Sequence, residues 1–172
     1  LVWGLARQAL RREFGSDHFA AGGLLNLTET VDGDAVLLGG RVSTASEVKG
    51  DLVAVGGEVA VGGAAGDDLY AAGGNVQVDA IVHGNARVAG GDVTVGPATL
   101  VAGALSLNGG RVTFEGSAQD SLQATGGSVR IDGEVGGDVE VRAEELQIGP
   151  GTRIAGRLVY RGPLEPEVSE GA

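Results

Sequence analysis

Residues 50–61 read GDLVAVGGEVAV, and close copies of this unit recur along most of the chain. Apolar residues alternate with others on both sides of its glycine pair: Leu52 and Ala54 before it, Val59 and Val61 after it. Alternation with a period of two is typical of a β-strand that buries one face. The unit therefore predicts two short strands that meet at a Gly-Gly corner.

The glycine pairs return at a nearly constant interval. They begin at Gly22, Gly39, Gly56, Gly73, Gly90, Gly109 and Gly126, and Ala143-Glu144 and Gly162-Pro163 continue the series. The interval is 17 residues except for two steps of 19, and both longer steps contain the insertion G-P-x-T, at residues 96–99 and 149–152. Strands this short cannot bury a face alone, and the repeats are too short for a helical crossover, so successive repeats must stack directly on one another.

This pattern predicts an all-β fold, a single-stranded parallel β-helix (solenoid) of about nine rungs of 17–19 residues that spans residues 15–163. We expect glycine at the corners for two reasons: it adopts positive φ, and it has no side chain to collide with the next rung. A phosphate-binding loop needs its glycines once, between a strand and a helix, so the recurrence of these pairs argues against that function.

Composition limits the functional classes. The chain has 172 residues, no Cys and a net charge of −11, from 12 Lys and Arg against 23 Asp and Glu. This balance argues against nucleic acid as a partner, because clustered basic side chains hold a phosphate backbone. His83 stands in a turn where an acyltransferase of the left-handed β-helix class would place a base, but hexapeptide repeats give that class rungs of about 18 residues. Because no residues converge on a reaction, we predict no enzyme, no cofactor and no small-molecule substrate.

One column of the repeat is acidic. It contains Asp17, Asp34, Asp51 and Asp68, followed by Asn85, Ala104, Ser121, Asp138 and Arg157. A ladder of carboxylates could bind Ca²⁺, whereas Asp in a turn ordinarily accepts hydrogen bonds from backbone N–H groups. We expect the turn role and no metal site, because no second acidic column completes a coordination shell. Sugar or ion binding on a lateral face remains the alternative function.

The two ends of the solenoid are the expected interaction sites, because unpaired strand edges attract another chain. Residues 1–14 predict a short amphipathic helix that caps the first rung or lies against a membrane, and residues 164–172 predict a flexible acidic tail. The expected membrane-proximal residues are Leu1, Val2, Trp3, Leu5, Leu10, Arg7, Arg11 and Arg12. The expected self-association residues are Phe14, Phe19 and Leu25 at one end and Leu158 and Tyr160 at the other.

The unit G-D-[LV]-x-A-x-G-G-x-V-x-[VI], as in residues 50–61, resembles the repeat of bactofilins, the bacterial polymer-forming cytoskeletal proteins, and in particular their membrane-linked relatives. The resemblance covers residues 17–162. It implies a right-handed triangular β-helix that assembles end to end into filaments or oligomers without nucleotide, often at the membrane, as a non-enzymatic scaffold. Two features depart from the family pattern: the amphipathic segment of residues 1–14, and Ala143-Glu144 in place of a glycine pair. The first puts filament formation in the cytosol in doubt, because a capped end cannot stack.

Overall fold

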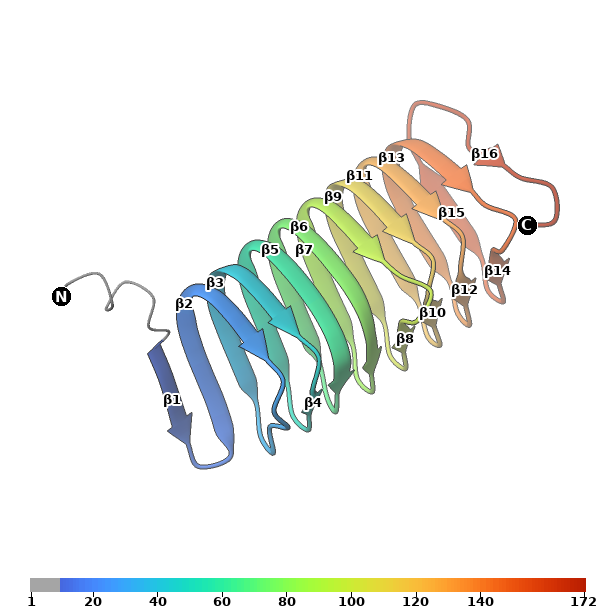
Figure 1. Cartoon of the computed structure of the whole chain (residues 1–172). Helices are drawn as coiled ribbons and strands as arrows, with labels where there is room; N and C mark the ends of the chain where they lie inside the picture. The colour runs from blue at the N-terminus through green and yellow to red at the C-terminus, as the bar shows by residue number, and fades with distance from the viewer. Residues whose placement is uncertain (1–9) are drawn as a thin grey trace.

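The structure is a computed structural model that describes residues 10–172, and these residues form a β-solenoid of about nine stacked coils (Figure 1). The described chain contains strands and turns and no helix. The predicted all-β parallel solenoid is confirmed. Most of the predicted N-terminal helix, residues 1–9, lies outside the described part of the chain.

The strands follow the repeat. The long strands are β1 (Leu10–Phe14), β2 (Asp17–Leu27), β3 (Ala35–Thr44), β5 (Leu52–Ala65), β6 (Leu69–Val82), β7 (Ala86–Val95), β9 (Leu105–Phe114), β11 (Leu122–Ile131), β13 (Val139–Ile148) and β15 (Leu158–Arg161). The short strands are β4 (Glu47–Val48), β8 (Leu100–Val101), β10 (Ser117–Ala118), β12 (Glu134–Val135), β14 (Arg153–Ile154) and β16 (Glu167–Val168).

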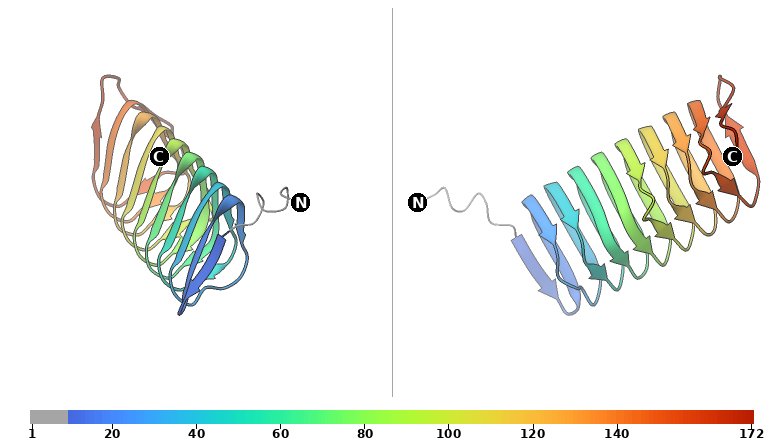
Figure 2. Two further views of the ribbon diagram at one scale, coloured as in Figure 1. Left: turned by 90° about the vertical axis from the view of Figure 1, so that its left-hand side faces the viewer. Right: turned by 45° about the vertical axis from the view of Figure 1, so that its right-hand side comes forward.

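Each coil has three sides. In β5, side 1 consists of residues 52–55 before the glycine pair, side 2 of residues 58–61 after it, and side 3 of residues 64–65. From β2 onward every strand pairs in parallel with its equivalent in the neighbouring coil (Figure 2). Equivalent residues therefore form straight columns along the rod, as in the register of Leu52 with Leu69 and of Val59 with Val76.

The inward columns fill the core with small and β-branched side chains. Leu52, Val76 and Val129 are 0–2% exposed, and Phe114 is the largest side chain that is fully buried. Burial of a Val or Leu side chain stabilises a fold by about 1.5–3 kcal/mol. Each coil contributes several such side chains, and these side chains pack against the coils before and after. A single coil could not bury them, so the fold is stable only as a stack.

The Gly-Gly corners are explained by close approach alone. Among the described residues, positive φ occurs at Gly15, Gly63 and Gly171 and at none of the corner pairs. A Cβ added to Gly56 or Gly73 would lie less than 3.0 Å from the carbonyl oxygen of the corner glycine in the preceding coil. The expectation of positive φ is wrong, and the expectation of a close backbone approach is confirmed.

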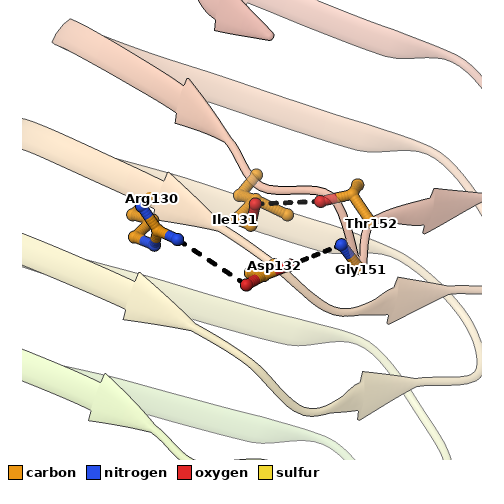
Figure 3. A network of polar contacts seen from close by, with 5 residues as sticks. All are labelled: Arg130, Ile131, Asp132, Gly151 and Thr152. Atoms are coloured by element: carbon orange, nitrogen blue, oxygen red, sulfur yellow. Dashed lines mark hydrogen bonds and ion pairs between the residues drawn. The ribbon is translucent and has the colours of Figure 1, made fainter. Parts of the chain in front are cut away.

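Both G-P-x-T insertions turn a buried threonine toward the preceding coil, and Figure 3 shows the second of them. The Thr152 hydroxyl donates a 2.9 Å hydrogen bond to the carbonyl oxygen of Ile131, and the amide of Gly151 donates to Asp132 Oδ1 at 2.7 Å. In the other insertion Thr99 is 2% exposed and makes the equivalent bond. Asp79 and Asp132 occupy equivalent positions, one coil before each insertion, and both crowd the glycine that opens it. The widened turn therefore passes around an Asp of the coil before it.

The N-terminal edge differs from the sequence prediction. Leu10–Phe14, the last five residues of the predicted helix, form strand β1, which runs antiparallel to β2 with Leu10 opposite Ala21 and Phe14 opposite Asp17. Gly15 takes φ 66° in the two-residue turn between these strands, a conformation that glycine supplies in tight hairpins. The hairpin satisfies part of an open sheet edge, which a helix could not do. The helix prediction is wrong for these five residues.

The C-terminal segment returns to the rod after β15. Within the predicted flexible tail, Glu167 and Val168 form β16 and pair in parallel with Gln147 and Ile148. The amide of Ser169 also donates a 2.9 Å hydrogen bond to the carbonyl oxygen of Ile148. The tail therefore supplies side 2 of the last coil.

Candidate functional site

The N-terminal end is partly closed by β1. This strand covers the side 1 edge of β2, whereas residues 24–27 of side 2 pair only with β3 among the described strands. Of the residues predicted for self-association here, Phe14 lies in β1, Phe19 points outward on side 1, and Leu25 is an inward residue that is 2% exposed. The structure therefore does not place Phe19 and Leu25 on one end surface.

The C-terminal end is open. In the described chain β14, β15 and β16 each pair with a strand of the preceding coils and with no strand beyond. Leu158 continues the inward column of Val139, yet 39% of its surface is exposed because no further coil of the described chain covers it. Tyr160 continues the column of Val141, and its hydroxyl donates to the carbonyl oxygens of Ala143 and Glu144 at 3.3 Å. Both residues predicted for this end therefore lie in core columns of the last coil.

Sequence reasoning missed a third apolar residue at this end. Val168 follows Ile148 in an inward column and is 62% exposed. The signal was weak, because the step from Ile148 to Val168 is 20 residues and Pro163 and Pro166 interrupt it. Leu158 and Val168 together leave an uncovered end of the core.

The acidic column is a hydrogen-bond ladder along the rod. Oδ1 of Asp17, Asp34, Asp51 and Asp68 accepts a bond of 2.8–2.9 Å from the amide of the next residue in the column. Asn85 and Asp138 make the same bond 19 residues on. The expected turn role of these carboxylates is confirmed. Within residues 10–172 no three acidic or histidine side chains are grouped as a metal site would require.

The ladder also explains why glycine precedes Asp in the repeat. A Cβ on Gly50 would collide with Oδ1 of Asp34, because that oxygen turns inward to meet the amide of Asp51. Gly84 is restricted in the same way by Asp68. Both residues of the G-D pair therefore serve the ladder: the Asp is its acceptor, and the glycine leaves room for the Asp of the preceding coil.

The outer surface of side 1 carries an open trough of about 860 Å³. Its lining includes Tyr70, Arg87, Asn108, Gln123 and Glu140, all from outward columns of consecutive coils. Arg142 donates two hydrogen bonds to Glu140, at 2.9 and 3.1 Å, and holds the pKa of this carboxyl below its usual range. The trough is an open surface lined by both polar and apolar side chains, and it does not enclose a cavity.

Side 2 and the turns carry ion pairs across adjacent coils. Arg41 meets Glu58 at 2.6 Å, and Arg111 lies 3.8 Å from Asp92. Lys49 meets Asp32 at 2.6 Å, and the hydrogen bond and charge of this Asp raise the pKa of the lysine. These pairs are exposed, so solvent and salt screen them and each one adds little to the stability of the fold.

The predicted membrane-proximal residues fall into two groups. Leu1, Val2, Trp3, Leu5 and Arg7 lie outside the described residues. Leu10, Arg11 and Arg12 belong to β1, where Arg12 stands opposite Phe19 on the outward face of side 1. Among residues 10–172 there is no helix with the length and hydrophobicity needed to cross a membrane.

Comparison of the chain with models of protein families, with curated proteins and with solved structures gave no match.

Proposed function

We propose that this chain is a non-enzymatic, bactofilin-like structural scaffold of a bacterial membrane that self-associates through the ends of its solenoid. The proposal includes a right-handed coil, which the family resemblance implies and which most crossovers between parallel strands adopt. The observation that carries it is the C-terminal end of the described chain, where β14, β15 and β16 each have one unpaired edge and the core-column residues Leu158 and Val168 are exposed.

The geometry restricts how ends can meet. A second copy that continued the parallel stack onto β2 would have to displace β1, because β1 occupies that edge. Two C-terminal ends can pair β15 with β15 about a two-fold axis without displacing a strand, since antiparallel pairing of equal edges is compatible with that symmetry. Association of C-terminal ends alone gives dimers, and filaments also need the outer edge of β1.

Two neighbouring residues of β15 test this proposal. Leu158 and Val159 are 39% and 43% exposed, but Leu158 continues an inward column and Val159 an outward one. We expect Leu158→Glu to abolish dimers or filaments in sedimentation velocity and negative-stain microscopy, and Val159→Glu to leave them intact. Circular dichroism checks that both variants keep the β-fold. A wild-type chain that stays monomeric at high concentration, or equal loss in both variants, contradicts end association.

Sugar or ion binding on a lateral face has less support. One oxygen of each ladder carboxylate is already engaged by a backbone amide, as at Asp34 and Asp51. Along the side 1 trough, Tyr70 is the one aromatic residue in the lining, so a sugar ring would find a single stacking surface. The scaffold is therefore the function that the geometry supports best.

A further inference from the structure

The outer surface of side 1 is close to neutral in a chain whose total charge is −11. The aspartate ladder forms one edge of this face and the glycine corners form the other. Two outward columns lie between these edges, the first with Val36 and Val53 and the second with Leu38 and Val55. From β2 to β15 the ladder and these columns carry six acids and four arginines, a net charge of −2: Asp17, Asp34, Asp51, Asp68, Asp138 and Glu140 against Arg87, Arg142, Arg157 and Arg161. Two copies of the face therefore repel each other only weakly.

The two outward columns match each other in size and polarity, coil by coil. From β3 to β13 the neighbours in the first and second columns are Val36 and Leu38, Val53 and Val55, Tyr70 and Ala72, Arg87 and Ala89, Ser106 and Asn108, Gln123 and Thr125, and Glu140 and Arg142. Two of these pairs are apolar, two set a large residue beside an alanine, two are polar and uncharged, and the last is an acid with a base. In each coil the two columns thus carry residues that can pack against each other.

A two-fold axis parallel to the rod uses this match. If the axis runs above the inward column of Ala54 and Ala71, it sets the first column of one copy against the second column of the other. Tyr70 then enters the part of the trough that the partner's Ala72 lines. Each ladder aspartate from β3 to β6 lies over a glycine of the partner's corner, as Asp51 does over Gly57, so no side chain opposes it. The fit ends at β13, where Asp138 would meet Glu144.

Other arrangements of two copies fit less well. An axis above the adjacent inward column, that of Leu52, would set the carboxylate of Asp51 against Val53. An antiparallel pair with the same overlap would set Arg87 against its own copy and Leu38 against Arg142. Like charges and buried unpaired charges both oppose such contacts.

We infer that side 1 binds side 1 of a second copy, with the two rods parallel and related by this two-fold axis. The face from β3 to β13 measures about 20 Å along the strands and about 34 Å along the rod, on the order of 700 Å² per copy. Standard interfaces bury about 800 Å² per partner, so this lateral contact is weak alone and strengthens assemblies that other contacts hold together. The inference goes beyond end association and does not use the edge of β15.

Cross-linking tests the contact, because the chain contains no Cys. Gln123 and Asn75 are both exposed amides, Gln123 on side 1 of β11 and Asn75 on side 2 of β6. In the parallel pair the two copies of Gln123 lie in the same coil, about 10 Å apart across the packed sheets. A bismaleimide of that length should therefore join Gln123→Cys chains and not Asn75→Cys chains. Both variants also carry Leu158→Glu, which removes end association, and are tested at roughly 0.1 mM because the contact is weak.

Two substitutions on β5 then locate the face. Val55→Glu and Ala60→Glu each add one acid to an exposed position, on side 1 and on side 2. In the chain with Gln123→Cys and Leu158→Glu, Val55→Glu should lower the yield of cross-linked dimer on the order of tenfold, since the acid would be buried against the partner's Val53. Ala60→Glu should leave the yield unchanged. Circular dichroism checks that both chains keep the β-fold.

The remaining results overturn the contact or separate it from end association. Equal yields from Gln123→Cys and Asn75→Cys would show random collision, and no product from Gln123→Cys would show that side 1 binds no parallel copy. A yield that Val55→Glu does not change would place the contact off this face. Specific cross-linking of Gln123→Cys, with a wild type that forms no end-joined assemblies, would support the lateral contact and contradict end association alone.

Discussion

The hydroxyl of Thr99 donates a 2.8 Å hydrogen bond to the carbonyl oxygen of Val78, which stands 21 residues earlier in the chain. Thr152 and Ile131 repeat this relationship at the second insertion. The two-residue insertion widens the turn, and the threonine fills the widened turn. Its hydroxyl adds a second hydrogen bond to a carbonyl that also accepts from a glycine amide, Gly96 to Val78 at 2.8 Å and Gly149 to Ile131 at 2.7 Å. The threonine of G-P-x-T is therefore structural.

Thr99→Val tests this role. The substitution keeps the shape of the side chain but removes the hydroxyl that donates to the carbonyl of Val78 and accepts from the buried amide of Ala80 at 3.3 Å, so we expect a loss of about 1–2 kcal/mol in the free energy of unfolding. Thr113→Val is the control, because Thr113 faces outward on β9 and is half-buried. Urea unfolding followed by circular dichroism measures both variants. An equal effect of the two substitutions would contradict the buried hydrogen bond.

The aspartate ladder predicts that stability depends on the acceptor oxygen of each Asp and not on its negative charge. Asp51→Ala should lower the free energy of unfolding by about 1–2 kcal/mol, because the amide of Asp68 loses its 2.8 Å acceptor. Asp51→Asn should be nearly neutral, since Asn85 already makes the same bond to the amide of Ala104. Millimolar calcium should leave the melting temperature of the wild type unchanged. Stabilisation that rises with calcium concentration would reinstate an ion site on this column.

The corner glycines predict a difference between two adjacent positions. Gly73→Ala places a Cβ against the carbonyl oxygen of Gly56 and within 3.1 Å of Val59 Cγ2, whereas the Cβ of Gly74→Ala meets one carbonyl oxygen at 3.0 Å. We expect Gly73→Ala to destabilise the rod by about 1–3 kcal/mol, as overpacking does, and Gly74→Ala to cost less. Thermal unfolding of both variants measures the difference. The reverse order would refute the steric explanation of the corners.

Repetition made the body of the fold predictable. The alternation around Gly56-Gly57 identifies strands, and its recurrence every 17 residues places equivalent side chains above one another, so the core columns followed from the sequence. The role of the aspartates followed from turn chemistry. The torsion angles at the corners did not, because glycine is compatible with both positive φ and close approach, and only the geometry distinguishes them.

The ends were harder to predict because they do not repeat. Residues 10–14 fit an amphipathic helix locally, but the unpaired edge of β2, which no local pattern reveals, holds them as β1. Residues 167 and 168 complete the last coil, but they follow their partners in β13 by 20 residues, whereas the other repeats are 17 or 19 residues long. The trough of side 1 has no signature in the repeat, because its lining residues such as Tyr70 and Arg87 belong to outward columns, where the residue type changes from coil to coil.

The hairpin at the N-terminal end gives the last prediction. Gly15 has φ 66° and open space around its Cβ position, so a substitution there strains the backbone without a clash. Gly15→Val should cost about 1–2 kcal/mol at this turn and loosen β1 from β2. Hydrogen exchange should accelerate at the amides of β1 and of residues 17–21 and stay unchanged in β6, while Ser16→Ala should match the wild type. Because β1 occupies the edge that a parallel neighbour would need, Gly15→Val should also shift assemblies toward larger sizes in sedimentation velocity. Faster exchange with unchanged assembly size would show that β1 does not limit stacking at this end.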